Sequence, residues 1–129
     1  MIEKIPESLE SEMAVLGSLL IDPASFYKIL NYLDTRDFYS NQNQIIYNTL
    51  LKIFSSGKKI DLLMVGQSLE DAGEIEQCGG RAYLASLINS ISTASGIKNY
   101  AEIIKDKSIR RQLLEAQQRN QSIIGDEEK

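Results

Sequence analysis

The chain has 129 residues, of which 43% are hydrophobic and 25% are charged, and its formal net charge is −4. This length and composition predict a single domain with its own hydrophobic core. The chain contains no histidine and a single cysteine, Cys78, which excludes imidazole catalysis, internal disulfides and zinc sites that use imidazole or clustered thiolates. No apolar run reaches the roughly 18 residues of a membrane helix. The acidic start, MIEKIPESLE, is unlike a targeting peptide, so we expect a cytoplasmic protein.

Two capping signals mark the first helices. Ser8 precedes an apolar stripe and predicts a helix whose first turns carry Glu10 and Glu12, where carboxylates stabilise the helix dipole. Asp22 and Pro23 predict the end of that helix and the start of a second one. The residues expected to face the core are Leu9, Met13, Leu16 and Leu20 in the first helix and Phe26, Ile29, Leu30 and Leu33 in the second.

A third helix is expected after the loop DTRDFY, from which Phe38 and Tyr39 should reach into the core. Asn41 is a suitable N-cap for this helix. Its apolar face consists of Ile46, Leu50, Ile53 and Phe54.

The stretch SSGKKIDLL, residues 55–63, admits two interpretations. A glycine followed by lysine is part of a phosphate-binding loop, but that loop also needs a glycine five residues earlier and a Ser or Thr after the lysine. Lysines occupy both of those positions here, Lys52 and Lys59, and no strand precedes them. We therefore interpret Gly57 as the residue that stops the third helix and Asp61 as the N-cap of a fourth.

Two further helices complete the globule. Gly73 should end the fourth helix, and the turn-rich string EIEQCGG should lead into the fifth, RAYLASLINS. The inward residues are expected to be Ile60, Leu62, Val65, Leu69, Tyr83, Leu84, Leu87 and Ile88. No segment alternates apolar and polar residues as a strand does. The sequence predicts an all-α fold, with a small orthogonal globule of about five helices over residues 1–94.

Residues 95–124 contain no proline and one glycine, Gly96, and predict a continuous helix about 45 Å long. Two interpretations stay open: a C-terminal helix whose first half packs on the globule, or an arm whose distal half needs another helix. The apolar stripe of Ile97, Tyr100 and Ile104 is followed, with a shift in phase, by Ile109, Leu113 and Ala116, which favours the arm. Residues 125–129, GDEEK, are expected to be a loop cut short.

The negative charge is concentrated in residues 61–96, which contain five acidic residues and one basic residue. A domain that binds phosphate backbones needs a basic face, so this distribution favours a protein partner. We predict no catalytic, metal-binding or cofactor-binding residue. The alternative is a stand-alone helical adaptor or DNA-binding regulator that uses residues 105–121, although the basic residues there are spread around the helix and interrupted by Asp106 and Glu115.

Five strings occur in a characteristic order: SLESEMAVLGSLLIDP, DFY, GKKIDL, CGGRAYLASL and GIKNYAEIIKDKSIRRQLLEA. Together they resemble the N-terminal domain of the bacterial and plastid replicative DNA helicase of the DnaB type, over residues 5–119. The resemblance implies a helical globule followed by a helical hairpin, of which residues 95–124 are the first arm. It also implies pairing through hairpins into a ring collar, above RecA-like motor domains that are absent from this sequence.

By the same resemblance, the parent is a hexameric ATP-dependent helicase, and ATP, magnesium and most DNA contacts belong to its motor domains. The collar is expected to pair with itself and to bind primase and, in some bacteria, a helicase loader, in the bacterial cytoplasm or the plastid stroma. Membrane contact is not expected. Positions that match the primase-facing surface are Glu10, Tyr83 and Leu114. Candidates for self-association are Ile104, Ile109, Leu113 and Leu114.

Overall fold

The computed structural model describes the backbone of residues 4–127 and the side chains of residues 4–120. The helices in chain order are α1 (Leu9–Ile21), the 3₁₀ helices η1 (Pro23–Lys28) and η2 (Thr35–Asp37), α2 (Asn41–Ser55), α3 (Leu62–Asp71), α4 (Gly80–Asn89) and α5 (Ile97–Glu127). All regular structure in this range is helical, which confirms the all-α prediction. Among the described helices, none combines the length and apolar character needed to span a membrane.

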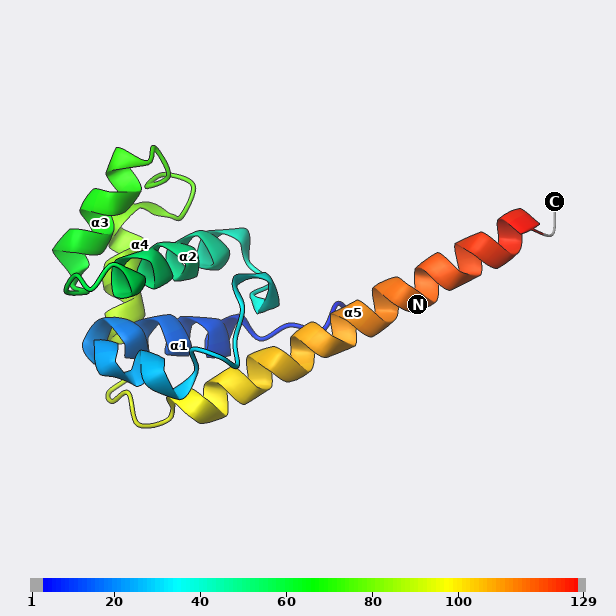
Figure 1. The fold of residues 1–129 in the computed structure, drawn as a ribbon, viewed down its shortest axis with the longest axis horizontal. Helices are drawn as coiled ribbons and strands as arrows, with labels where there is room; N and C mark the ends of the chain where they lie inside the picture. The colour runs from blue at the N-terminus through cyan, green and yellow to red at the C-terminus, as the bar shows by residue number, and fades with distance from the viewer. Residues whose placement is uncertain (1–3, 128–129) are drawn as a thin grey trace.

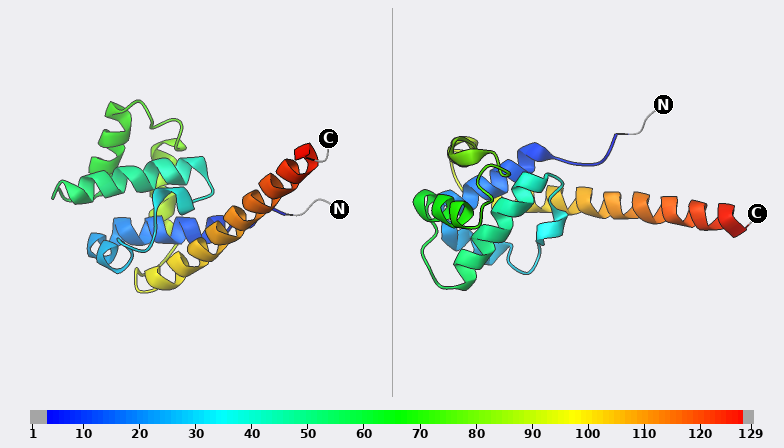
Figure 2. Two further views of the ribbon diagram at one scale, coloured as in Figure 1. Left: turned by 45° about the vertical axis from the view of Figure 1, so that its right-hand side comes forward. Right: turned by 90° about the horizontal axis from the view of Figure 1, so that it is seen from above.

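The elements from α1 to α4 form a globule, and α5 extends from it as a long arm (Figure 1). The start of α5 lies beside α1, α4 crosses α1 from behind, and α3 lies at the end of the globule away from the arm (Figure 1). The N-terminal segment leaves the globule on the same side as the arm, as the two further views also show (Figure 2). At about 1.5 Å per residue, the 31 residues of α5 span about 46 Å.

The hydrophobic core is centred on α1, whose Val15, Leu16 and Leu19 are fully buried. The core continues beyond residue 94 into α5, because Ile97, Ala101 and Ile104 belong to the same buried cluster. Gly17 permits the close crossing of α1 and α4, since a Cβ there would collide with the backbone carbonyl of Leu87. The first part of α5 is therefore part of the globule.

Gly57 and Gly73 end α2 and α3 as predicted. Both have positive φ, and each is followed by a residue whose N–H reaches back to the helix: Lys58 bonds Ile53 O and Glu74 bonds Leu69 O. This is the glycine-terminated motif that satisfies the last carbonyls of a helix. The predicted caps Ser8 and Asp61 are also confirmed, because their side chains accept hydrogen bonds from backbone N–H groups of α1 and α3.

Several local predictions were wrong. The second helix is a 3₁₀ helix, closed by the Ile29 N–H bond to Phe26 O. The N-cap of α2 is Ser40 rather than Asn41, because the Ser40 hydroxyl accepts from Asn43 N. The exposed apolar residues that had been assigned to the core are Leu9, Tyr39 and Leu62. Leu9 and Leu62 each begin a helix at the edge of the globule, and Ile60 fills the core beside the Asp61 cap.

The C-terminal end of α5 also differs from the prediction. The helix continues to Glu127, so residues 125–127, which had been expected to form a loop, are helical. Residues 128–129 lie outside the described range.

Candidate functional site

A buried carboxylate fixes α5 to the globule. Asp37 is 1% exposed, and its side chain accepts hydrogen bonds from Lys105 Nζ at 2.8 Å and Ser108 Oγ at 2.7 Å. A third hydrogen bond, at 2.8 Å, comes from the backbone N–H of Asp34. Hydrogen bonds to an ionised carboxylate are short and strong, so Asp37 ties two turns of α5 to η2.

Arg111 adds a second tie one turn further along α5. Its guanidinium donates from Nη2 to the carbonyl of Asp37 at 2.7 Å and from Nη1 to the carbonyl of Pro6 at 2.9 Å. It also lies over the ring of Tyr39, 5.4 Å from the ring centroid. We refer to Asp37, Lys105, Ser108 and Arg111 as the arm clamp, because together they set the direction in which α5 leaves the globule.

The charge of Asp37 is stabilised despite its burial. Burial alone would raise the pKa of Asp37, but the hydrogen bonds from Lys105, the Asp34 backbone and Ser108, together with the positive charge of Lys105, bring it below the ordinary value of 3.8. The carboxylate is therefore ionised at neutral pH, and it accepts both hydrogen bonds from α5 in its charged form.

A second buried carboxylate, Glu12, connects α1 to α2. It accepts from the backbone N–H groups of Tyr39 at 2.7 Å and Ser40 at 3.3 Å, and from Asn43 Nδ2 at 2.9 Å. The Oδ1 of Asn43 then accepts from the hydroxyl of Tyr83 on α4, at 2.6 Å. Glu12 had been assigned to the dipole of its own helix, but its carboxylate lies at the N-terminus of α2. This network links three helices.

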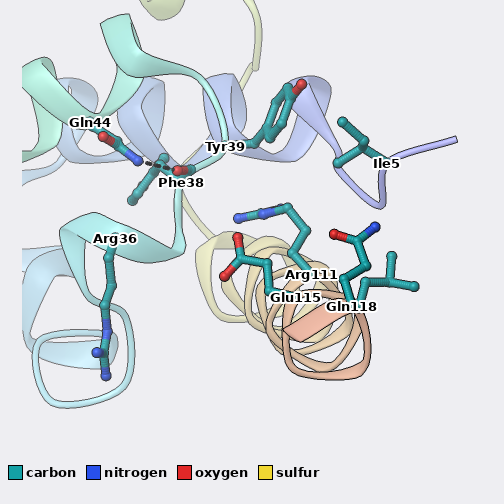
Figure 3. Close-up of a pocket in the computed structure, with 9 residues that line it drawn as sticks. Ile5, Arg36, Phe38, Tyr39, Gln44, Arg111, Glu115 and Gln118 are labelled. Carbon is teal, nitrogen blue, oxygen red and sulfur yellow. Dashed lines mark hydrogen bonds between the residues drawn. The ribbon is translucent and has the colours of Figure 1, made fainter. Parts of the chain in front are cut away.

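Two shallow grooves border the arm at Leu114. One, of about 420 Å³, lies between Leu114 on α5, Ile5 in the segment before α1 and Tyr39 in the loop before α2. Figure 3 shows Arg111 extending from α5 below Tyr39, with Glu115 and Gln118 next to it and Ile5 above Gln118. The other groove, about 410 Å³, is lined by Lys4, Pro6, Arg110, Leu113, Leu114 and Gln117.

The structure places the three predicted primase contacts on separate parts of the surface. Glu10 is exposed on α1 and lines a groove of about 700 Å³ with Tyr100 and Ile103 of α5. Tyr83 is half-buried on α4, and its hydroxyl is bound to Asn43. Leu114 is half-buried on the arm. Glu10 lies beside α5 and Leu114 is on it, whereas Tyr83 is on α4.

The four predicted self-association residues divide into two kinds. Ile104 is 2% exposed and packs in the core of its own globule, so its assignment to a surface was wrong. Ile109 and Leu113 are 48% and 64% exposed. Together with Ala116 they follow the i, i+4, i+7 spacing of one helix face. That face points away from Ile104. Leu113 follows Ile104 by nine residues, and at about 100° per residue it lies on the opposite side of the helix.

The residues that bear on the predicted absence of metal, nucleotide and thiol chemistry have structural roles here. No group of three or more potential metal ligands occurs among the described residues. Gly57 serves as a helix stop. Cys78 is buried, and burial raises the pKa of its thiol, which disfavours the reactive thiolate.

The DNA-binding alternative is weakened by the contacts of the basic residues in 105–121. Lys105 and Arg111 are bound within the arm clamp, and Arg110 pairs with Asp106 at 3.0 Å. A recognition helix presents such side chains free on one face.

Sequence reasoning missed the arm clamp and the Glu12 network. The residues of the arm clamp do stand in two of the quoted strings. Asp37 begins DFY, and Lys105 and Arg111 are six positions apart in KDKSIRRQ. Neither string contains a pattern that indicates contact between the two segments.

The chain is similar to known proteins over most of its length. The family model described as the DnaB-like helicase N terminal domain matches residues 4–106 of this chain. The replicative DNA helicase DnaB of Geobacillus stearothermophilus is 35% identical over 109 residues, which is 84% of this chain and 24% of the helicase. The chain thus spans about a quarter of that relative.

Two solved structures have the same fold. The crystal structure of the N-terminal domain of DnaB helicase from Mycobacterium tuberculosis superposes with a TM-score of 0.87 and 32% identity, over 90% of this chain and 83% of that chain. A DnaB-like replicative helicase, described together with its interactions with primase, gives a TM-score of 0.75 over 90% of this chain and 28% of that chain. At 24% identity, the second match shows the fold alone.

Proposed function

Because this chain belongs to the family of DnaB-like helicase N-terminal domains, we propose that it is the assembly and docking domain of a replicative DNA helicase. In this role it pairs through its arm to shape the ring collar of a hexamer, and it binds primase. The observation that carries the proposal is the α5 arm, which is fixed to the globule by the arm clamp and carries exposed Ile109 and Leu113 beyond it.

Catalysis belongs to the rest of the parent protein in this proposal. The chain corresponds to about a quarter of the length of the Geobacillus helicase, and its described residues contain no candidate metal cluster. We assign ATP, magnesium, the unwinding of duplex DNA and the main DNA contacts to the motor domains of the parent. The same collar binds a helicase loader in organisms that have one, and the site of action is the bacterial cytoplasm.

Two features of the molecule and one comparison support docking rather than chemistry. The grooves along α5 are open and shallow and contain a mixture of apolar and charged side chains, as Leu114, Arg110 and Glu115 illustrate. The buried carboxylates Asp37 and Glu12 are fully engaged in hydrogen bonds that position helices. A solved relative of the same fold is described with its primase interactions.

The proposal is tested by titrating a fluorescently labelled primase from the same organism with the 129-residue chain. Saturable binding that competes with unlabelled chain is expected. The absence of any binding, with a chain shown to be folded by circular dichroism, would contradict the docking role.

A further inference from the structure

We propose that residues 4–6, which we call the strap, form a displaceable cover over Leu114 and that Arg111 is its latch. The strap precedes the Ser8 cap and therefore has no place in the hydrogen-bonded ladder of α1. It leaves the globule on the same side as α5 (Figure 2). This inference rests on the proposed function only for the identity of the partner that displaces the strap.

The position of Leu114 shows what the strap covers. Leu114 lines the groove that contains Ile5 and also the groove that contains Lys4 and Pro6. The strap thus divides what would otherwise be one continuous surface around this side chain. Removing it would join the two grooves and expose Leu114, which is half-buried in the closed arrangement.

The strap is attached by few contacts. Its one side-chain hydrogen bond among the described residues runs from Arg111 Nη1 to the carbonyl of Pro6, at 2.9 Å. Ile5 remains 53% exposed, and Lys4 is exposed as well. A segment held by one hydrogen bond and little apolar burial opens locally at low cost, without unfolding of the globule.

Arg111 is suited to act as a latch because its two terminal nitrogens donate to acceptors in different parts of the chain. Nη2 is bound to the carbonyl of Asp37, which belongs to the globule, while Nη1 is bound to the strap. The guanidinium therefore stays in place over Tyr39 when the strap leaves. A primase surface that covers Leu114 can then accept a hydrogen bond from the freed N–H of Arg111.

The first test measures the accessibility of Leu114 without any partner. Leu114→Cys is prepared in the full chain and in a chain that begins at Glu7, and its rate of maleimide modification is compared. Cys78 is buried and gives a slow background. We expect the rate to rise roughly two- to tenfold when the strap is removed, because the net free energy of about one hydrogen bond changes an equilibrium constant by that factor.

Ile109→Cys is the matched control, since Ile109 lies on the same helix, is 48% exposed and lines neither groove. Its rate should be the same in both chains. Equal rates for Leu114→Cys with and without the strap would overturn the cover. A parallel increase at both cysteines would also overturn it, because it would show general loosening of α5.

The second test uses primase as the probe. The chain that begins at Glu7 should bind primase more tightly than the full chain by the same factor as the change in modification rate. Equal affinities, with a faster Leu114→Cys reaction, would show that the strap covers Leu114 but does not compete with primase, and would overturn the gating. If neither chain binds primase, the docking proposal fails, and the modification rates alone decide whether the strap is a cover.

Discussion

The carboxylate of Asp37 and the ammonium of Lys105 lie 2.8 Å apart although 68 positions separate them in the chain. Asp37 is almost completely buried, and the side chain of Lys105 is 26% exposed. The pair joins η2 to the first third of α5, and Ser108 and Arg111 extend the contact over two turns. The direction of the arm is therefore set by polar contacts at its base.

Asp37→Asn should destabilise the domain by about 2–4 kcal/mol, because it leaves the Lys105 charge and the Ser108 hydroxyl with a weaker partner in a buried site. Urea unfolding followed by circular dichroism measures this change. Asp106→Asn is the control, since Asp106 forms an exposed pair with Arg110 and should cost less than about 0.5 kcal/mol. Equal effects of the two substitutions would contradict the arm clamp.

The contribution of Asp37 should also depend on pH in a defined direction. The pKa of Asp37 in the folded chain lies below its ordinary value of 3.8, so its stabilising effect is fully present above that value and is lost as the pH falls through the folded pKa. The difference in unfolding free energy between the natural chain and Asp37→Asn should be constant between about pH 7 and 5 and shrink below about pH 4. A difference that grows on acidification would refute this assignment.

Two substitutions of Tyr83 distinguish its hydrogen bond to Asn43 from a contact with primase. Tyr83→Phe removes the hydroxyl bond to the buried Asn43 and should lower the unfolding free energy by about 1 kcal/mol. It keeps the ring, so primase binding should change less than about twofold, whereas Tyr83→Ala should weaken binding by about fivefold or more. A folded Tyr83→Ala chain that binds primase normally would remove this residue from the docking surface.

The exposed face of the arm should support weak pairing of two chains. Fully burying a leucine contributes roughly 1.5–3 kcal/mol, so Ile109 and Leu113 together favour a dimer at high protein concentration. Sedimentation equilibrium should show concentration-dependent association of the natural chain and a monomer for Leu113→Glu. Leu63→Glu is the control, because Leu63 is 74% exposed on α3, at the other end of the globule. A strict monomer for the natural chain would contradict pairing through this stretch of the arm.

The elements that could be predicted from the sequence are those whose causes are local. Ser8, Asp61, Gly57 and Gly73 begin or end helices through bonds to residues within five positions. The family resemblance, carried by strings spread over the chain, was confirmed by the matching family model and fold. Capping and glycine stops therefore suffice to place most of the helix boundaries here.

The tertiary polar contacts could not be predicted, because their partners are distant in sequence. Glu12 and Asp37 both look like exposed acids near a helix end, yet each is buried and accepts several hydrogen bonds. Ile104 continues the apolar stripe of α5 and was assigned to an interface, but the globule itself covers it. The helical period shows which residues share a face and leaves open whether that face meets its own chain or another one.

The measurement that tests the central claim most directly is the affinity of primase for three forms of the chain: natural, Leu114→Asp and Leu63→Asp. Both leucines are on helices, but Leu114 borders the two grooves of the arm, whereas Leu63 is exposed on α3. We predict that Leu114→Asp weakens binding by more than about tenfold and that Leu63→Asp leaves it unchanged, with both variants folded. Equal affinity for all three forms would contradict docking through the arm.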